Sequence, residues 1–207
     1  MNDNSKYFEI LNTITPSDTE TMLREWGYNF GGEYVEMVYA ASLDTKYLVY
    51  DFATGTGRMV SVLTRMGYDV ITGDITDVQR PDAVSRIRNE YLHKVKFIDI
   101  NLEKLPFEEN SIENIVCINT LHHLEKPEKS ISELIRTTSK TGTLLIADFN
   151  TLGFDVMDKV HLKKNNELHA RGIATREMTE KLLSEKFSSV MHWDTDLNWG
   201  LIAKSKK

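Results

Sequence analysis

The sequence predicts an α/β fold: a doubly wound, mostly parallel seven-stranded sheet with an antiparallel C-terminal hairpin and a helical N-terminal cap. Three observations predict it. After residue 45, short apolar runs typical of buried strands alternate with helix-length amphipathic segments. A glycine-containing turn at residues 51–59 joins the first such run to a helical pattern. Two strand-like runs near the C-terminus lie close enough together to form a hairpin.

Five strands are expected to pair in parallel, because helix-sized segments separate them. Each is a run of mostly apolar and β-branched residues bounded by polar or glycine-containing turns. In chain order they are residues 46–51, 68–74, 94–100, 113–119 and 142–149. Two further runs, 188–195 and 198–205, form the expected hairpin, with Asp196 and Leu197 between them.

The helices are predicted from apolar residues at helical spacing. They cover residues 57–67, 80–93, 127–139 and 174–187. Pro81 and Pro127 lie near the starts of two of them, where a missing N–H costs least. Residues 1–45 hold two more expected helices and are interpreted as a helical cap or lid over a domain at 46–207.

Composition limits the class of protein. A chain of 207 residues suits one globular domain, with or without an added segment. Its net charge of -6 and the lack of a dense Lys and Arg block argue against nucleic acid as a partner. The single Cys117 excludes an internal disulfide framework. We found no signal pattern and no apolar run near the roughly 18 residues of a membrane span, so a soluble cytoplasmic protein is expected.

The turn at residues 51–59 departs from two phosphate-binding motifs. A P-loop requires Lys and then Ser or Thr after the last glycine, but Arg58 and Met59 follow Gly57. A dinucleotide motif requires a third glycine where Val60 stands. Asp51 would also repel a pyrophosphate. A cationic ligand fits this turn better.

The segment DFATGTG resembles the first motif of the class I S-adenosylmethionine-dependent methyltransferases, with Ala53 at the motif's first glycine. Asp74, which closes VITGD, is similar to the family's ribose-binding acid. The stretch DINLEKLPFEENSIENIVCINTLHHLEKP resembles the third and fourth motifs, in which Asp99 and Ile100 would flank the adenine. The resemblance spans about residues 46–150, and it implies a Rossmann-like fold with S-adenosyl-L-methionine as cofactor.

The residue types suit that cofactor. Asp51 is expected to organise the loop by accepting backbone N–H bonds, and the Asp74 carboxylate can accept both ribose hydroxyls. Asp99 could accept from the adenine amino group while the Ile100 amide donates to a ring nitrogen, although Asp99 could instead form only an Asx turn. Ala53 is expected to have a negative φ. The expected cofactor-binding residues are Asp51, Ala53, Thr54, Gly55, Gly57, Asp74, Ile75, Asp99, Ile100 and Asn119.

The candidate catalytic residues are His122 and His123, which follow the fourth strand near the expected position of the sulfonium methyl. An imidazole there could act as general base, or it could brace the next helix. The family resemblance favours a supporting role for His123. At most one of these adjacent side chains is expected to face the methyl group.

No metal site is expected. Asp148 and Asn150 match poorly the metal site of catechol-type family members, in which Asp and Asn are adjacent. His161 and His169 have no evident third ligand in the sequence.

Aromatic residues interleaved with glycines near residue 30 could form a mobile lid over the cofactor or fill the core beneath the first strand. The lid interpretation includes Tyr28 and Tyr34, with Asn150 as a further residue on the substrate side.

The sequence therefore predicts a methyltransferase, a transferase enzyme that acts on a small molecule by in-line displacement. A nicotinamide-dependent oxidoreductase is the first alternative, but the third glycine and a Tyr-Lys catalytic pair are missing. A non-catalytic cofactor-binding module is the second. The identity of the methyl acceptor and the oligomeric state do not follow from the sequence.

Overall fold

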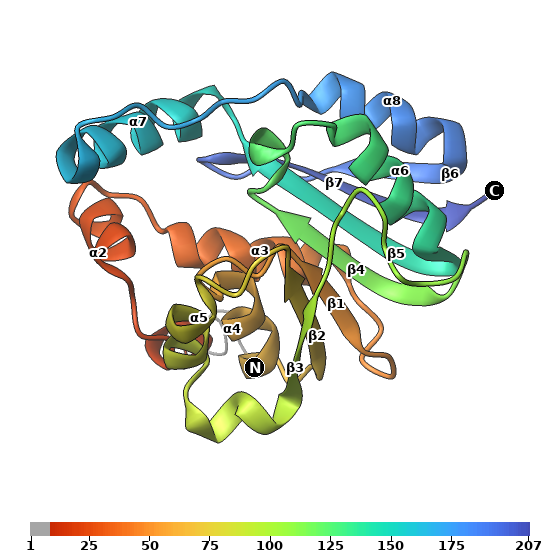
Figure 1. Cartoon of the computed structure of the whole chain (residues 1–207), viewed down its shortest axis with the longest axis horizontal. Coiled ribbons are helices and arrows are strands. Elements are labelled where there is room, and N and C mark those ends of the chain that lie inside the picture. The colour runs from red at the N-terminus through yellow and green to blue at the C-terminus, as the bar shows by residue number, and fades with distance from the viewer. Residues whose placement is uncertain (1–8) are drawn as a thin grey trace.

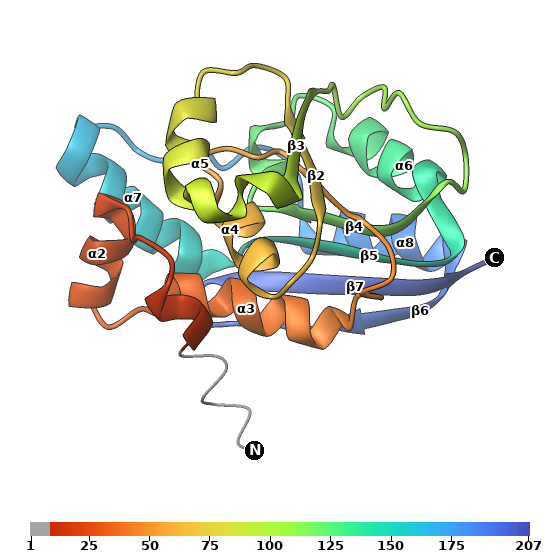
Figure 2. The same cartoon turned by 90° about the horizontal axis from the view of Figure 1, so that it is seen from below.

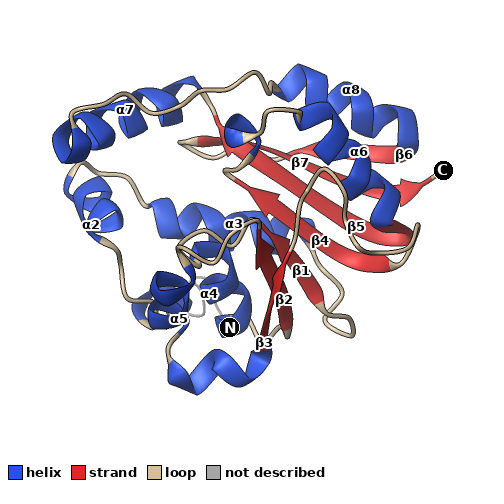
Figure 3. Ribbon diagram, in the orientation of Figure 1, coloured by secondary structure: helices blue, strands red, loops and turns tan. Residues whose placement is uncertain are grey.

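The computed structural model describes residues 9–207, so residues 1–8 of the predicted cap lie outside the described part. Its centre is one seven-stranded sheet with the strand order β3-β2-β1-β4-β5-β7-β6 (Figures 1 and 3). The strands are β1 Val49–Phe52, β2 Val70–Asp74, β3 Val95–Asp99, β4 Ile112–Ile118, β5 Thr138–Phe149, β6 Phe187–His192 and β7 Asn198–Lys206. Strands β1 to β5 pair in parallel, whereas β7 is antiparallel to both β5 and β6. The predicted fold class is confirmed.

Helices cover both faces of the sheet (Figure 2). They are α2 Asp18–Glu25, α3 Phe30–Ala41, α4 Arg58–Arg65, α5 Arg80–Ile87, α6 Pro127–Thr137, α7 Thr151–Asn165 and α8 Arg176–Lys186, with short 3-10 turns η1 Asn89–Lys94 and η2 Leu121–His123. Among the described residues, no helix combines the length and the apolar character needed to cross a membrane.

Two hydrophobic cores result from the alternation of side chains along the strands. In β4, Val116 and Ile118 face the core shared with α3, α4 and α7, whereas Ile115 and Cys117 face the core shared with α6 and α8. Strands buried on both faces explain why the sequence shows continuous apolar runs in these segments instead of alternating ones. The ends of these strands are thereby fixed between two packed layers.

Helix α7 was not predicted, and it occupies most of the segment after β5. It begins because the Asn150 side chain accepts a hydrogen bond from the Gly153 N–H at 2.9 Å, which caps its first turn. Gly153 also packs so closely that an added Cβ would lie 2.0 Å from the Leu197 carbonyl oxygen. Only a stripe formed by Val156, Met157 and Val160 is buried beyond this glycine, so the amphipathic signal is weak.

Several predicted boundaries were wrong, including the following three. The helix expected over 80–93 ends at Ile87, because Arg88 has a φ of 71° and redirects the chain into η1. Strand β5 begins at Thr138 instead of residue 142, since α6 leads into it directly. Strand β6 ends at His192, so the hairpin turn is longer than Asp196 and Leu197 alone.

A buried ion-pair network attaches α2 to α4 and α5. The Glu20 carboxylate, 5% exposed, accepts hydrogen bonds from Arg58 Nε at 3.1 Å and from Arg86 Nη1. The same carboxylate bonds the Ser17 N–H and completes a capping box at the start of α2. Burial by itself raises the pKa of Glu20, but Arg58 and Arg86 outweigh it and lower the pKa to about 2.

Replacing this carboxylate should destabilise the fold in a pH-dependent way. We expect Glu20→Gln to lower the free energy of unfolding by about 3 kcal/mol near pH 7, because Arg86 then stays buried without its partner. The folded-state pKa lies below the unfolded value of 4.5, so the stabilisation exists above pH 4.5 and is lost as the pH falls toward 2. Urea unfolding of both proteins between pH 2 and pH 8 measures the difference.

The matched control is Glu25→Gln in the same helix, whose side chain is exposed. It should change the free energy of unfolding by less than about 0.5 kcal/mol. A Glu20→Gln variant as stable as this control at pH 7 would contradict the role of the network.

Candidate functional site

The turn between β1 and α4 is built from residues in the left-handed backbone region. Gly55 has a φ of 50° and Gly57 a φ of 79°, and Gly57 caps the N-terminus of α4. An added Cβ on Gly57 would lie 2.7 Å from the Ala83 Cα of α5, so no larger residue fits. Ala53 has a φ of 73°, and the expected negative φ was therefore wrong. This alanine holds a conformation that glycine adopts without strain.

A chain of hydroxyl groups fixes Asp51 at the end of β1. The Thr72 hydroxyl donates to Asp51 Oδ2 at 2.8 Å, and the Thr54 hydroxyl lies 2.7 Å from Thr72 Oγ1. The expected backbone N–H partners for Asp51 were therefore wrong, because β2 supplies the donor. Burial raises the pKa of Asp51 to about 7; the Thr72 hydrogen bond opposes this, and the charge of Asp74 adds to it.

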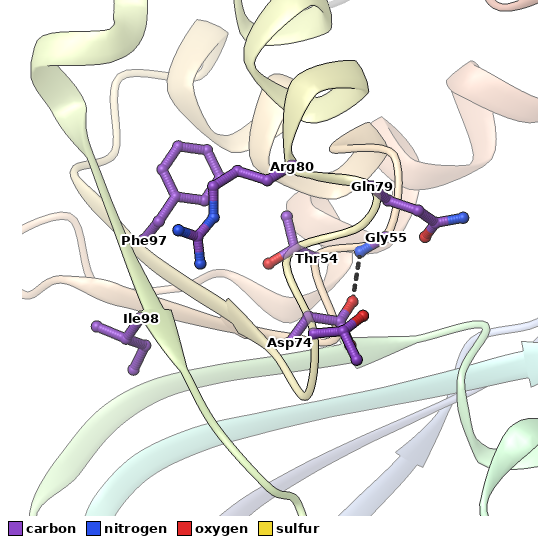
Figure 4. Close-up of a pocket in the computed structure, with 8 residues that line it drawn as sticks. Thr54, Gly55, Asp74, Gln79, Arg80, Phe97 and Ile98 are labelled. Carbon is purple, nitrogen blue, oxygen red and sulfur yellow. Dashed lines mark hydrogen bonds between the residues drawn. The ribbon is translucent and has the colours of Figure 1, made fainter.

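Asp74, at the end of β2, faces the glycine turn. Its Oδ2 accepts the Gly55 N–H at 3.0 Å (Figure 4). Its Oδ1 accepts the Ile75 N–H at 2.9 Å. Each oxygen can still accept a second hydrogen bond. The neighbouring Ile75 side chain is 68% exposed, which offers an apolar surface beside this carboxylate. A small pocket here is lined by Thr54, Gly55, Asp74, Thr76, Gln79, Arg80, Phe97 and Ile98.

Asp99 and Ile100 lie beside Asp74, as the parallel register of β2 and β3 requires. Asp99 is exposed and pairs with Arg80 Nη2 at 2.7 Å. The Ile100 N–H donates to the Asp74 carbonyl oxygen at 2.9 Å. The predicted donation from the Ile100 amide to an adenine nitrogen was therefore wrong, because the sheet already uses that N–H.

Asn119 follows β4 with a φ of 52° and lies at the same edge of the sheet. Its Nδ2 donates to the Tyr34 hydroxyl at 3.0 Å. Its Oδ1 is buried without a hydrogen-bond partner. A buried, unpaired carbonyl oxygen is uncommon in folded proteins, so this oxygen is a candidate acceptor for a donor from a ligand.

The residues predicted for the lid lie in different surroundings. Phe30 and Tyr34 of α3 are 1% and 3% exposed and belong to the core on that side of the sheet, while Tyr28 is half-buried. Asn150 is occupied as the cap of α7, and its Nδ2 also donates to the Asp196 carbonyl oxygen at 3.0 Å. These contacts give Tyr34 and Asn150 structural roles.

His122 and His123 differ sharply in their surroundings. His122 is 3% exposed; its Nδ1 lies 2.6 Å from Asp148 Oδ1, and its backbone N–H donates to Asp148 Oδ2 at 2.9 Å. His123 is exposed, and its ring centroid lies 3.9 Å from that of His122. The supporting role that the sequence analysis gave to His123 is thus filled by His122.

Two histidines from the segment after β5 complete the group. His169 Nε2 lies 3.0 Å from His122 Nε2, and His169 Nδ1 lies 3.1 Å from His161 Nε2. Burial and the neighbouring imidazoles lower the pKa of His169 to about 4, so this ring is neutral at pH 7. No third partner for His161 and His169 was evident from local sequence, because His122 lies 47 positions before His169.

Part of the chain is similar in sequence to known methyltransferases. Residues 50–146 match the family model described as a methyltransferase domain. A ubiquinone/menaquinone biosynthesis C-methyltransferase, UbiE, from Shewanella halifaxensis is 28% identical over 119 residues, which are 55% of this chain and 47% of the relative. A demethylmenaquinone methyltransferase from Clavibacter sepedonicus is 25% identical over 103 residues, 50% of this chain and 41% of the relative. The chain spans about half the length of the curated relatives it matches.

Solved structures share the fold. A putative S-adenosylmethionine-dependent methyltransferase from Methanococcus maripaludis has a TM-score of 0.66 at 16% identity, covering 91% of this chain and 92% of that one. The YcgJ protein from Bacillus subtilis has a TM-score of 0.64 at 15% identity, covering 84% and 98% of the two chains. At these identities the comparison establishes the architecture of the sheet and its helices.

Relieving the strain at Ala53 should stabilise the protein. We expect Ala53→Gly to raise the free energy of unfolding by about 0.5–1 kcal/mol, because the left-handed penalty of alanine exceeds the extra chain entropy of glycine. Ala40→Gly in α3 is the control and should lower it by about 1 kcal/mol, since that position is helical. Denaturant unfolding compares the three proteins; a destabilised Ala53→Gly would contradict the strain argument.

Asp51 should give the stability of the protein a characteristic pH dependence. Its folded pKa is about 7, above the unfolded value of 3.8, so the folded state binds the extra proton between these values. Stability from this group therefore falls as the pH rises from 4 to 7, with a slope of at most about 1.4 kcal/mol per pH unit.

Asp51→Asn removes this titration while keeping an acceptor for the Thr72 hydroxyl. Relative to the parent protein, the variant should gain stability as the pH rises from 4 to 7 and level off above pH 8. Asp82→Asn, at an exposed position of α5, should follow the parent. Parallel stability curves for Asp51→Asn and the parent would refute the assignment.

Proposed function

We propose that this chain, whose residues 50–146 match the family model described as a methyltransferase domain, is a class I S-adenosylmethionine-dependent methyltransferase that transfers a methyl group to a small molecule. The observation that carries the proposal is the position of Asp74, which faces the Gly55 amide of the strained turn with acceptor capacity to spare. The residues proposed for the cofactor site lie at the ends of three neighbouring strands, β2, β1 and β4.

The residues at this edge fit the cofactor. Asp74 would hold the ribose hydroxyls, and the exposed Ile75 would contact the adenine. The unpaired Asn119 Oδ1 fits a cationic N–H donor such as the ammonium group of the methionine portion. The Asp51, Thr72 and Thr54 side chains would hold the turn and make no contact with ligand in this proposal.

The cofactor supplies a methyl group on a sulfonium, already activated for in-line displacement. The chain's own contribution is alignment and exclusion of water. We give His122 no proton-transfer role, because Asp148 and His169 face its two ring nitrogens. Of these two adjacent histidines, His123 is the exposed one.

A small, apolar acceptor is proposed. The printed names of the relatives describe C-methylation in ubiquinone and menaquinone biosynthesis, which supports a small molecule without identifying it. In this chain, Leu168 and Ile173 are 67% and 69% exposed on the segment that passes over His122, where an added Cβ on Gly172 would lie 2.3 Å from the His122 carbonyl oxygen. We further propose that residues 1–45 act as the cap of this site and that the protein is cytoplasmic.

Ligand binding tests the cofactor assignment. S-adenosylhomocysteine should raise the melting temperature through binding to the folded state, and NAD should not. Asp74→Ala should weaken S-adenosylhomocysteine binding by about 1.5–3 kcal/mol in calorimetry, because hydrogen bonds from two hydroxyls to a charged group are lost. Asp69→Ala is the matched control, since this exposed acid directly precedes β2 at its opposite end.

The outcomes separate the alternatives. Stabilisation by NAD and not by S-adenosylhomocysteine would replace the methyltransferase with an oxidoreductase. Binding of S-adenosylhomocysteine without methyl transfer to any member of a panel of small aromatic and quinone-type acceptors would favour a non-catalytic module. Equal binding by the Asp74→Ala and Asp69→Ala proteins would remove Asp74 from the site.

A further inference from the structure

Four histidines, here called the histidine cluster, meet at the carboxyl ends of β4 and β5: His122, His123, His161 and His169. They come from η2, α7 and the segment after α7. One ring nitrogen each from His122, His123 and His169 lie within 4.8 Å of one another. Imidazole is the commonest metal ligand among side chains, and it suits zinc, copper, iron and nickel.

The distance between His122 and His169 suits a shared ion. Zinc binds imidazole nitrogen at about 2.0–2.1 Å, so two ligands of a tetrahedral site lie about 3.4 Å apart. The separation of His122 Nε2 and His169 Nε2 is 3.0 Å, which an ion between them would widen only slightly. His123 is the exposed member, so an ion can reach the group from its side.

The groups behind these rings match the outer partners of metal-binding histidines. Asp148, 3% exposed, holds His122 Nδ1 at 2.6 Å, so the proton sits on Nδ1 and the Nε2 lone pair points toward His169. His161 Nε2 lies 3.1 Å from His169 Nδ1 and fixes the second ring in the same manner. A carboxylate buried behind one ligand also offsets part of a divalent charge.

A plain hydrogen-bonded chain is the competing explanation. In it, His169 Nε2–H donates to His122 Nε2 and His161 Nε2–H donates to His169 Nδ1. That chain accounts for three rings and leaves His123 without a purpose, although its ring lies 3.9 Å from His122 and 5.5 Å from His169 between ring centroids. An ion accounts for all four.

We propose that His122, His123 and His169 bind one divalent first-row transition ion, for which zinc is the best match, with Asp148 and His161 orienting two of the ligands. Three protein ligands leave one tetrahedral position open, the arrangement of catalytic zinc sites. Phe149 packs against both His122 and His169 and also stacks on Phe30 of α3.

The test measures metal binding without cofactor or acceptor, so its result is independent of the proposed methyl transfer. Protein stripped with a chelator is dialysed against zinc, and bound metal is counted; we expect about one ion per chain and a higher melting temperature with zinc. Cobalt(II) serves as the optical probe and should give the visible absorption of a tetrahedral nitrogen site.

Variants assign the ligands. His123→Ala and His169→Ala should each lower zinc affinity by at least about 100-fold, and Asp148→Asn by about 10- to 100-fold. His93→Ala, at an exposed histidine of η1, is the control and should bind zinc as the parent does. His169→Ala removes a buried ring, so its folding is checked by denaturant unfolding. If His169→Ala does not fold, the exposed position His123→Ala provides the decisive comparison.

Two results would overturn the proposal: less than about one-tenth of an ion per chain in the parent protein, or equal affinity in the parent and His123→Ala. Each leaves the hydrogen-bonded chain as the explanation. The thermal shift with S-adenosylhomocysteine, measured on the same stripped protein, shows separately whether the cofactor site is intact.

Discussion

The parallel register of β1, β2, β4 and β5 is the constraint on which the whole site depends. Parallel pairing brings the carboxyl ends of these strands to one edge of the sheet. Backbone pairing between the strands stops there, so polar groups need other hydrogen-bond partners. Asp51, Asp74, Asn119 and Asp148 all stand at this edge. The three acids take partners from a neighbouring strand or from a turn at this edge, and Asn119 bonds Tyr34 of α3, so the register of the sheet sets the geometry of the site.

This edge stores strain that the two cores compensate. Ala53 and Asn119 both hold a positive φ, and Asn119 keeps a buried oxygen without a partner. Such features persist only when packing on all sides prevents relaxation. The closely packed Gly57 and the buried Glu20 network supply that packing on the α3 and α4 side. Strain and an unpaired acceptor at one location are what a ligand site is expected to carry.

The edge has two chemically different halves. Around β1 and β2 the groups are a carboxylate and backbone amides, which suit hydroxyl groups and a positively charged ligand. Around β4 and β5 they are imidazoles supported by one buried carboxylate. Asn119 stands between the halves, bonded to Tyr34 of α3. Helix α3 therefore contacts the middle of the edge through this hydrogen bond, while its aromatic side chains pack in the core.

The sequence by itself determined the order of strands and helices, the glycine turn and the acids at strand ends, because periodicity and turn chemistry act between residues a few positions apart. Only the tertiary structure decided that the Ile100 N–H bonds the Asp74 carbonyl, that Ala53 takes a positive φ, and that His122 meets His169. Those outcomes depend on partners from distant segments, and no local pattern encodes a contact across 47 positions. Helix α7 belongs with the second group, because both its Asn150 cap and its close packing against Leu197 appear only in the structure.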